Sequence, residues 1–218
     1  MYFQFLIEDQ SSAELIEILM KKIADVYPGI TYSCKSFKGI GGFTKKNTVK
    51  ETKTGKLLND LATYLRGFNR SLRYIDAAII VVLDNDDRNT EVFREELEDV
   101  AAKNNIDIDH VFCIAVEEVE AWLLGDEEAL LKAYPSAKIQ VLKSYIQDSI
   151  CGTWEILADA IYPGGLSKFR KDCTTYIEVG SYKCEWARRI GVHMNFKENK
   201  SPSFQFFIGE IYKRLPAM

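Results

Sequence analysis

The chain has 218 residues, of which 47% are hydrophobic and 12% aromatic, as is typical of a globular domain with a full core. The net charge is −4, and two histidines with five scattered cysteines argue against a zinc site and a disulfide framework. The longest wholly apolar run, 77–83, is too short to cross a bilayer, and the first residues lack the features of a signal peptide. We therefore expect a cytoplasmic protein without membrane association.

Strands and helices are expected to alternate in the first part of the chain. Apolar runs predict strands at 2–8, 30–37, 77–83 and 110–116, and apolar periodicity predicts helices at 9–27, 57–68, 89–105 and 117–124. Ser11 and Glu14 form a candidate capping box for the first helix. Near-continuous apolar strands that alternate with helices favour an α/β domain with a mainly parallel sheet flanked by helices.

The second part of the chain is expected to be mostly helical. Apolar periodicity predicts helices at 126–135, 154–163, 181–194 and 201–215. Ser201 is the expected cap of the last helix, with Pro202 at its first position. We expect an α/β domain over 1–125 and a helical extension over 126–218 that packs on it as one compact unit.

Charge is distributed unevenly along the chain. The segment 84–128 contains sixteen acidic residues against three basic ones, whereas 35–56 contains seven lysines against one acid, Glu51. The segment 168–214 is again basic, with ten Lys or Arg against five acids. An acidic centre between two basic segments would suit a site in which the acids bind metal ions and the basic residues around them bind phosphate. The alternative is that solvated helix faces alternate in sign.

Acidic residues follow three of the expected strands at the point where each strand ends. They are Glu8 and Asp9 after the first strand, Asp84, Asp86 and Asp87 after the third, and Glu117, Glu118 and Glu120 after the fourth. Because the carboxyl ends of parallel strands meet at one edge, these acids would repel one another unless protonated or neutralised by a cation. Oxygen ligands without Cys or His favour Mg²⁺ or Mn²⁺ over zinc. For any single acid, the alternative is a helix cap or a loop contact. Glu117 and Glu120 are expected to share one face of a helix.

Several other arrangements of acids and phosphate-binding loops do not match. A receiver domain would place its second acid nearer the first than 84 − 8 = 76 residues, and the dehalogenase pattern would need Thr where Arg88 stands. A phosphate-binding loop would need Ser or Thr after Gly55-Lys56, where the residue is Leu57.

Glu8 after the first strand and Asp84-Asn85-Asp86 after the third resemble the two acidic motifs of the Toprim domain. The chain also resembles, more narrowly, a family of uncharacterised bacterial Toprim-like proteins related to the overcoming-lysogenisation-defect nucleases and often encoded beside ATPases. The resemblance lies, in order, in "FLIEDQSSAEL", "VVLDNDD", "AVEEVEAWLLGD", "YKCEWARRIGVHM" and "SPSFQFF". These pieces are distributed along most of the chain, from 5 to 207, and "EEVEAWLLGD" and "SPSF" are the most distinctive.

The resemblance implies a Toprim- or Rossmann-like fold and a nuclease that uses Mg²⁺ or Mn²⁺, with two ions. It also implies a role in defence against phage or foreign DNA, an ATPase partner, and DNA rather than RNA as substrate. The ions would be held by Glu8, Asp84 and Asp86, with Glu120 as an outer ligand or the base that orients a water. Lys183 would face the charge that grows on the phosphate.

Basic side chains around this acidic centre are the candidate contacts to nucleic acid. They are Lys38, Lys45, Lys46, Lys50, Arg188 and Arg189. Trp122 and Trp186 are interpreted as core residues rather than base-stacking surfaces. Two other functions stay open: phosphoryl transfer on a small nucleotide, and a non-catalytic module that partners an ATPase.

Overall fold

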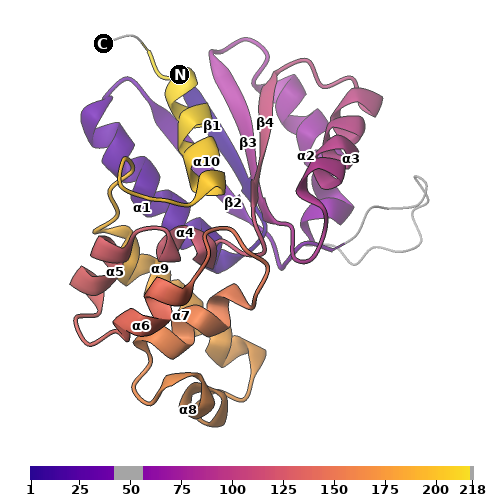
Figure 1. Ribbon diagram of the computed structural model, residues 1–218. Coiled ribbons are helices and arrows are strands. Elements are labelled where there is room, and N and C mark those ends of the chain that lie inside the picture. The colour runs from indigo at the N-terminus through magenta and orange to yellow at the C-terminus, as the bar shows by residue number, and fades with distance from the viewer. Residues whose placement is uncertain (42–55, 217–218) are drawn as a thin grey trace.

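The computed structural model describes residues 1–41 and 56–216. Its centre is a four-stranded sheet in the order β2-β1-β3-β4, in which every neighbouring pair is parallel (Figure 1). The strands are β1 (Tyr2–Ile7), β2 (Thr31–Ser36), β3 (Ala77–Asp84) and β4 (Asp109–Ala115). The prediction of an α/β fold with a parallel sheet flanked by helices is confirmed.

Helices cover both faces of the sheet. α1 (Gln10–Val26) and α10 (Pro202–Lys213) lie on one face, and α2 (Leu57–Ser71) and α3 (Thr90–Lys103) lie on the other (Figure 1). All eight residues of β3 are buried, because this inner strand has helices on both sides.

The remaining helices gather beyond the carboxyl ends of the strands (Figure 1). They are α4 (Glu120–Leu124), α5 (Glu127–Ala133), α6 (Ile139–Ser144), α7 (Thr153–Ile161), α8 (Gly165–Asp172) and α9 (Tyr176–Gly191). α6 and α8 were not predicted, since helices this short show little periodicity. The predicted start of α9 was also too late: Thr175 and Glu178 form a capping box at its first turn, but Tyr176 and Ile177 in that turn are exposed and do not belong to an apolar stripe.

The start of the first helix differs from the prediction. Asp9, not Ser11, is the N-cap of α1, and its carboxylate accepts hydrogen bonds from the Ser12 N–H at 2.8 Å and the Ser11 hydroxyl at 3.1 Å. The predicted capping box of Ser11 and Glu14 is therefore wrong: the helix begins earlier, and the stronger charged acceptor takes the capping position. Ser201 and Pro202 begin α10 as expected.

The last helix joins the sheet to the C-terminal helices. Phe207 of α10 stacks on Trp122 of α4 with ring centroids 5.0 Å apart, and the Trp122 indole N–H donates to the Ser203 hydroxyl at 2.9 Å. Trp122 and Trp186 are buried, which confirms their interpretation as core residues. One hydrophobic cluster runs from β1 through α4 and α7 to α9 and α10, so the two parts of the chain share a core.

Among the helices in residues 1–41 and 56–216, none is both long enough and apolar enough to span a membrane.

The neighbouring phenylalanines of α10 provide a test of this shared core. Phe207 is fully buried, so Phe207→Ala should lower the free energy of unfolding by about 3–5 kcal/mol. Phe206 is 38% exposed and lies over Arg94, so Phe206→Ala should cost only about 1 kcal/mol or less. Urea denaturation of both variants measures the difference, and equal losses would contradict the assigned packing.

Candidate functional site

The candidate site begins where the strand order reverses. β1 is followed in the chain by β2 on one side, while β3 pairs with β1 on the other, so a crevice opens at the carboxyl ends of β1 and β3. Glu8 follows β1 and Asp84 ends β3, which places both at this crevice. Tertiary structure thus brings together two acids that are far apart in the chain.

Hydrogen bonds fix both carboxylates. Glu8 Oε2 accepts from the backbone N–H of Asp84 at 3.0 Å, and Asp84 Oδ1 accepts from the backbone N–H of Val119 at 3.0 Å. Each acid therefore connects its own strand end to the next one, from β1 to β3 and from β3 to the segment after β4. Both side chains are held in one orientation before any ligand arrives.

Asn85 connects the same loops, and it was not among the predicted site residues. It is 1% exposed, its Oδ1 accepts from the Glu117 N–H, and its Nδ2 donates to the Arg88 carbonyl and the Thr90 hydroxyl. The amide of Asn85 has both an acceptor oxygen and donor N–H groups, whereas an ionised aspartate can only accept hydrogen bonds. The sequence did offer one indication of this structural role: Asn85 is an uncharged residue between two aspartates.

Lys183 reaches the acidic edge from α9. Its Nζ lies 3.1 Å from Glu120 Oε2 and 3.6 Å from Glu118 Oε2, and its side chain is 14% exposed. Burial by itself lowers the pKa of Lys183, but the charges of Glu120 and Glu118 outweigh it and the net shift is upward. The ammonium stays protonated and neutralises part of the cluster.

The acids at this edge are harder to ionise than acids in water. Burial raises the pKa of Glu8 to about 7 and that of Glu118 to about 8, with Lys183 opposing both shifts. Burial, then the charge of Glu8, raises the pKa of Asp84 well above its usual value. Burial likewise raises the pKa of Glu120 against the effect of Lys183. Closely grouped carboxylates with raised pKa values mark a candidate functional site.

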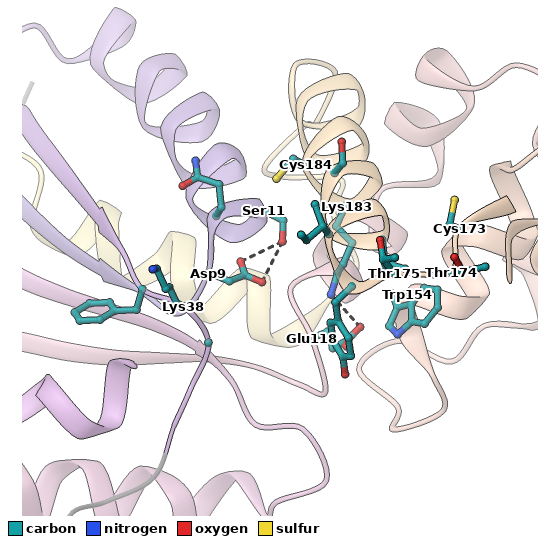
Figure 2. Close-up of a pocket in the computed structure, with 18 residues that line it drawn as sticks. Asp9, Ser11, Lys38, Glu118, Trp154, Cys173, Thr174, Thr175, Lys183 and Cys184 are labelled. Atoms are coloured by element: carbon teal, nitrogen blue, oxygen red, sulfur yellow. Dashed lines mark hydrogen bonds and ion pairs between the residues drawn. The ribbon is translucent and has the colours of Figure 1, made fainter. Parts of the chain in front are cut away.

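A cavity of about 890 Å³ opens beside these acids. Figure 2 shows Asp9 and Lys38 on one side of it, Lys183 and Glu118 at its centre, and Trp154 with Thr174 and Thr175 on the other side. Glu118 and Lys183 line the cavity, whereas Glu8, Asp84 and Glu120 are not among its lining residues. Glu118 Oε2 is buried and lies 3.6 Å from Lys183 Nζ, and no group in residues 1–41 and 56–216 donates a hydrogen bond to it.

The prediction that Glu117 and Glu120 share one face of a helix is wrong. Glu117 precedes α4 in a left-handed backbone conformation, φ 61°. Its carboxylate accepts from the backbone N–H groups of Cys151, Gly152 and Thr153 at the start of α7. The helix begins later than predicted because the chain turns first, and Glu117 is thereby directed to a capping role away from Lys183.

Asp86 lies at the outer side of the cluster. It is exposed, has φ 51°, and forms an ion pair with Arg88 at 3.0 Å. Its charge contributes to the raised pKa of Glu8, which places it near that carboxylate. The structure thus brings together Glu8, Asp84, Glu120 and Lys183, with Asp86 at the edge.

The predicted nucleic-acid contacts are only partly gathered here. Lys38 is exposed and lines the cavity. Arg188 pairs with Glu14 at 3.3 Å, and Arg189 pairs with Glu185 at 3.2 Å, and neither lines the cavity. Lys45, Lys46 and Lys50 lie outside the described residues.

The chemistry of the donor set can be compared with that of a divalent ion. No donor in the described part of the chain reaches Glu8 Oε1 or Asp84 Oδ2, so each carboxylate keeps one oxygen for a ligand. Within residues 1–41 and 56–216, no three His, Cys, Asp or Glu side chains stand together in an arrangement that could hold a metal ion. Mg²⁺ commonly binds through one or two carboxylates, completed by water and substrate phosphate. Glu8 and Asp84 fit that mode by their chemistry.

Comparison of this chain with protein-family models, with curated proteins and with solved structures gave no match. The assignment of a function therefore depends on the geometry of the site and on the motifs in the sequence.

The raised pKa values predict how stability depends on pH without divalent ions. Glu8 and Glu118 titrate near 7 and 8 when folded but near 4.5 when unfolded, so the folded chain holds more protons between these values. The free energy of unfolding should therefore fall as pH rises from about 5 to about 8, by at most ~1.4 kcal/mol per pH unit for each group. Urea denaturation in EDTA across this range measures the slope.

Two variants serve as controls for that pH slope. Glu118→Gln should flatten it, because one of the titrating groups is gone. Glu117→Gln should change it little: burial alone would raise the pKa of Glu117, but hydrogen bonds from Thr153 and its neighbours lower it below the tested range. The charge of Glu117 is also the smallest of the named contributions to the raised pKa of Glu118. Stability that rises between pH 5 and pH 8 in the unmodified chain would contradict the assigned environment of Glu8 and Glu118.

Proposed function

We propose that this protein is a divalent-metal-dependent phosphodiesterase that hydrolyses nucleic acid. The observation that carries the proposal is the group of buried acids with Lys183 at the switch point of a parallel sheet, beside an open cavity. Such crevices hold the ligands of open α/β sheets, and acids with raised pKa values gain most from a bound cation. The resemblance of Glu8 and Asp84-Asn85-Asp86 to the Toprim motifs supports the same reaction class.

Glu8 and Asp84 would hold Mg²⁺ or Mn²⁺ through their remaining oxygens, with Asp86 as the next candidate ligand. When bound, the ion supplies the Lewis acidity and positive charge that phosphodiester hydrolysis requires. For a second ion, Glu120 is the candidate ligand. Its carboxylate pairs with Lys183, so a change in that pairing would accompany binding.

Lys183 would bind the phosphate. Lys183 lines the cavity, and its ammonium could donate to a non-bridging phosphate oxygen, where charge grows in the transition state. The Glu118 carboxylate next to it has a pKa of about 8, raised by burial, so it can hold or release a proton near neutral pH. Asn85 would act indirectly, by keeping the loops that carry Asp84 and Glu117 in register.

The substrate is proposed to be a polynucleotide, DNA rather than RNA, with an ATPase as partner protein in defence against foreign DNA. The resemblance supports these points, together with Lys38 at the cavity and the basic segments flanking the acids. The second candidate is phosphoryl transfer on a small nucleotide. It is favoured by the cavity volume of about 890 Å³, which falls in the usual range of small-molecule sites.

Divalent ions should stabilise the protein. A cation between Glu8 and Asp84 removes their repulsion, and at a hundred times its dissociation constant it adds about 2.7 kcal/mol to the free energy of unfolding. The melting temperature should rise with millimolar Mn²⁺ in the unmodified chain and in Asp107→Asn, an exposed acid at the opposite edge of the sheet. An unchanged melting temperature would favour a non-catalytic module, in which Lys183 alone neutralises the acids.

Asp84→Asn tests catalysis directly. The amide keeps the oxygen that accepts from the Val119 N–H but removes a charge and is a poorer metal ligand. Mn²⁺-dependent cleavage of plasmid and single-stranded DNA should fall at least ~100-fold. The melting temperature without metal should be unchanged or higher, because one source of repulsion is gone. Lower stability with intact cleavage would show that Asp84 only braces the loop.

A further inference from the structure

The cavity has an apolar wall that the reaction at the acidic edge does not use. Trp154 of α7 lines it and is only partly buried, unlike the other two tryptophans of the chain. Tyr176 and Ile177, in the first turn of α9, line the same cavity and are 97% and 85% exposed. Large apolar side chains are usually buried, because burial is favourable. Three such side chains that stay at least partly exposed around one cavity therefore indicate a surface that binds a ligand.

The same cavity has a charged side. Lys183 and Lys38 both line it, and Figure 2 shows Lys183 between Lys38 on one side of the cavity and Trp154 on the other. Two acids also line it, but Glu118 pairs with Lys183, and the carboxylate of Asp9 is occupied by Ser11 and Ser12. A flat aromatic ring next to cationic side chains is the combination that binds a nucleobase together with its phosphate.

We propose that this cavity binds an unpaired nucleotide of a single-stranded polynucleotide, with its base on Trp154 and its phosphate at Lys183. A base inside a duplex is already stacked and paired, so it would have to leave the helix to enter the cavity, and that costs free energy. Single strands are therefore the preferred ligand. The inference builds on the proposed function, because it places the phosphate of the strand at the same lysine.

The test is a binding measurement with the full chain. A fluorescein-labelled twelve-residue oligothymidylate and the same strand annealed to its complement are titrated in millimolar Ca²⁺, with a gel to show that the strand stays intact. The single strand should bind roughly tenfold or more tightly than the duplex. It should also quench tryptophan fluorescence, and the change should come from Trp154, since Trp122 and Trp186 are at most 2% exposed.

Substitutions separate stacking from simple loss of structure. Trp154→Ala should weaken single-strand binding by about five- to a hundredfold, whereas Trp154→Phe, which keeps a ring, should restore most of it. Because Trp154 also packs on Phe169, Tyr176→Ala is the safer variant: its side chain has almost no contacts to lose, yet binding should weaken. Tyr74→Ala, an aromatic residue 87% exposed at the opposite edge, is the matched control and should bind like the unmodified chain.

Three results would overturn the inference. They are equal or tighter binding of the duplex, unchanged binding in both Trp154→Ala and Tyr176→Ala, and binding of free thymidine monophosphate as tight as that of the strand. Cleavage in Mn²⁺ is measured separately on the same samples. Trp154-dependent binding without cleavage would refute the proposed hydrolysis alone, and cleavage without preference for single strands would refute this inference alone.

Discussion

The arrangement of this site depends on one buried ion pair, between Lys183 of α9 and Glu120 at the start of α4. A carboxylate as buried as that of Glu120 is costly unless it is neutralised, and removing one member of such a pair leaves the other uncompensated. The pair therefore constrains where α9 can lie. It joins the C-terminal helices to the carboxyl edge of the sheet, and it places a cation beside Glu8 and Asp84, whose own charges no described cation contacts directly.

Around this pair, backbone hydrogen bonds give the acids defined positions. Glu8 accepts from the strand that carries Asp84, Asp84 accepts from the segment that precedes α4, and Asn85 connects both loops. Acids held close together at high pKa are unfavourable for stability, and proteins tolerate such arrangements chiefly at functional sites. A site strained in this way gains free energy when a cation or a phosphate with its cation arrives. The shared core of α4, α7, α9 and α10 supplies the stability that the acidic edge lacks.

The cavity combines surfaces from both parts of the chain. Asp9 and Lys38 come from the α/β part, whereas Trp154, Tyr176 and Lys183 come from α7 and α9. Neither part could form it alone, which gives the C-terminal helices a role beyond covering the sheet. Because the aromatic side chains and Lys183 come from the C-terminal helices and Lys38 comes from the α/β part, a ligand with a flat ring and a phosphate would contact both.

The sequence by itself determined the parallel α/β architecture, because period and composition report directly on which residues are buried. It also placed Glu8, Asp84 and Glu120 near one edge, since strand ends in a parallel sheet converge. The sequence did not predict local backbone geometry. Asp9 rather than Ser11 caps α1, and Glu117, at φ 61°, caps the start of α7. Only the tertiary structure decided that Lys183 pairs with Glu120, that Asn85 holds the loops, and that Trp154 opens into a cavity. Those contacts join residues more than thirty positions apart in the chain, and periodicity carries no information about distant pairing.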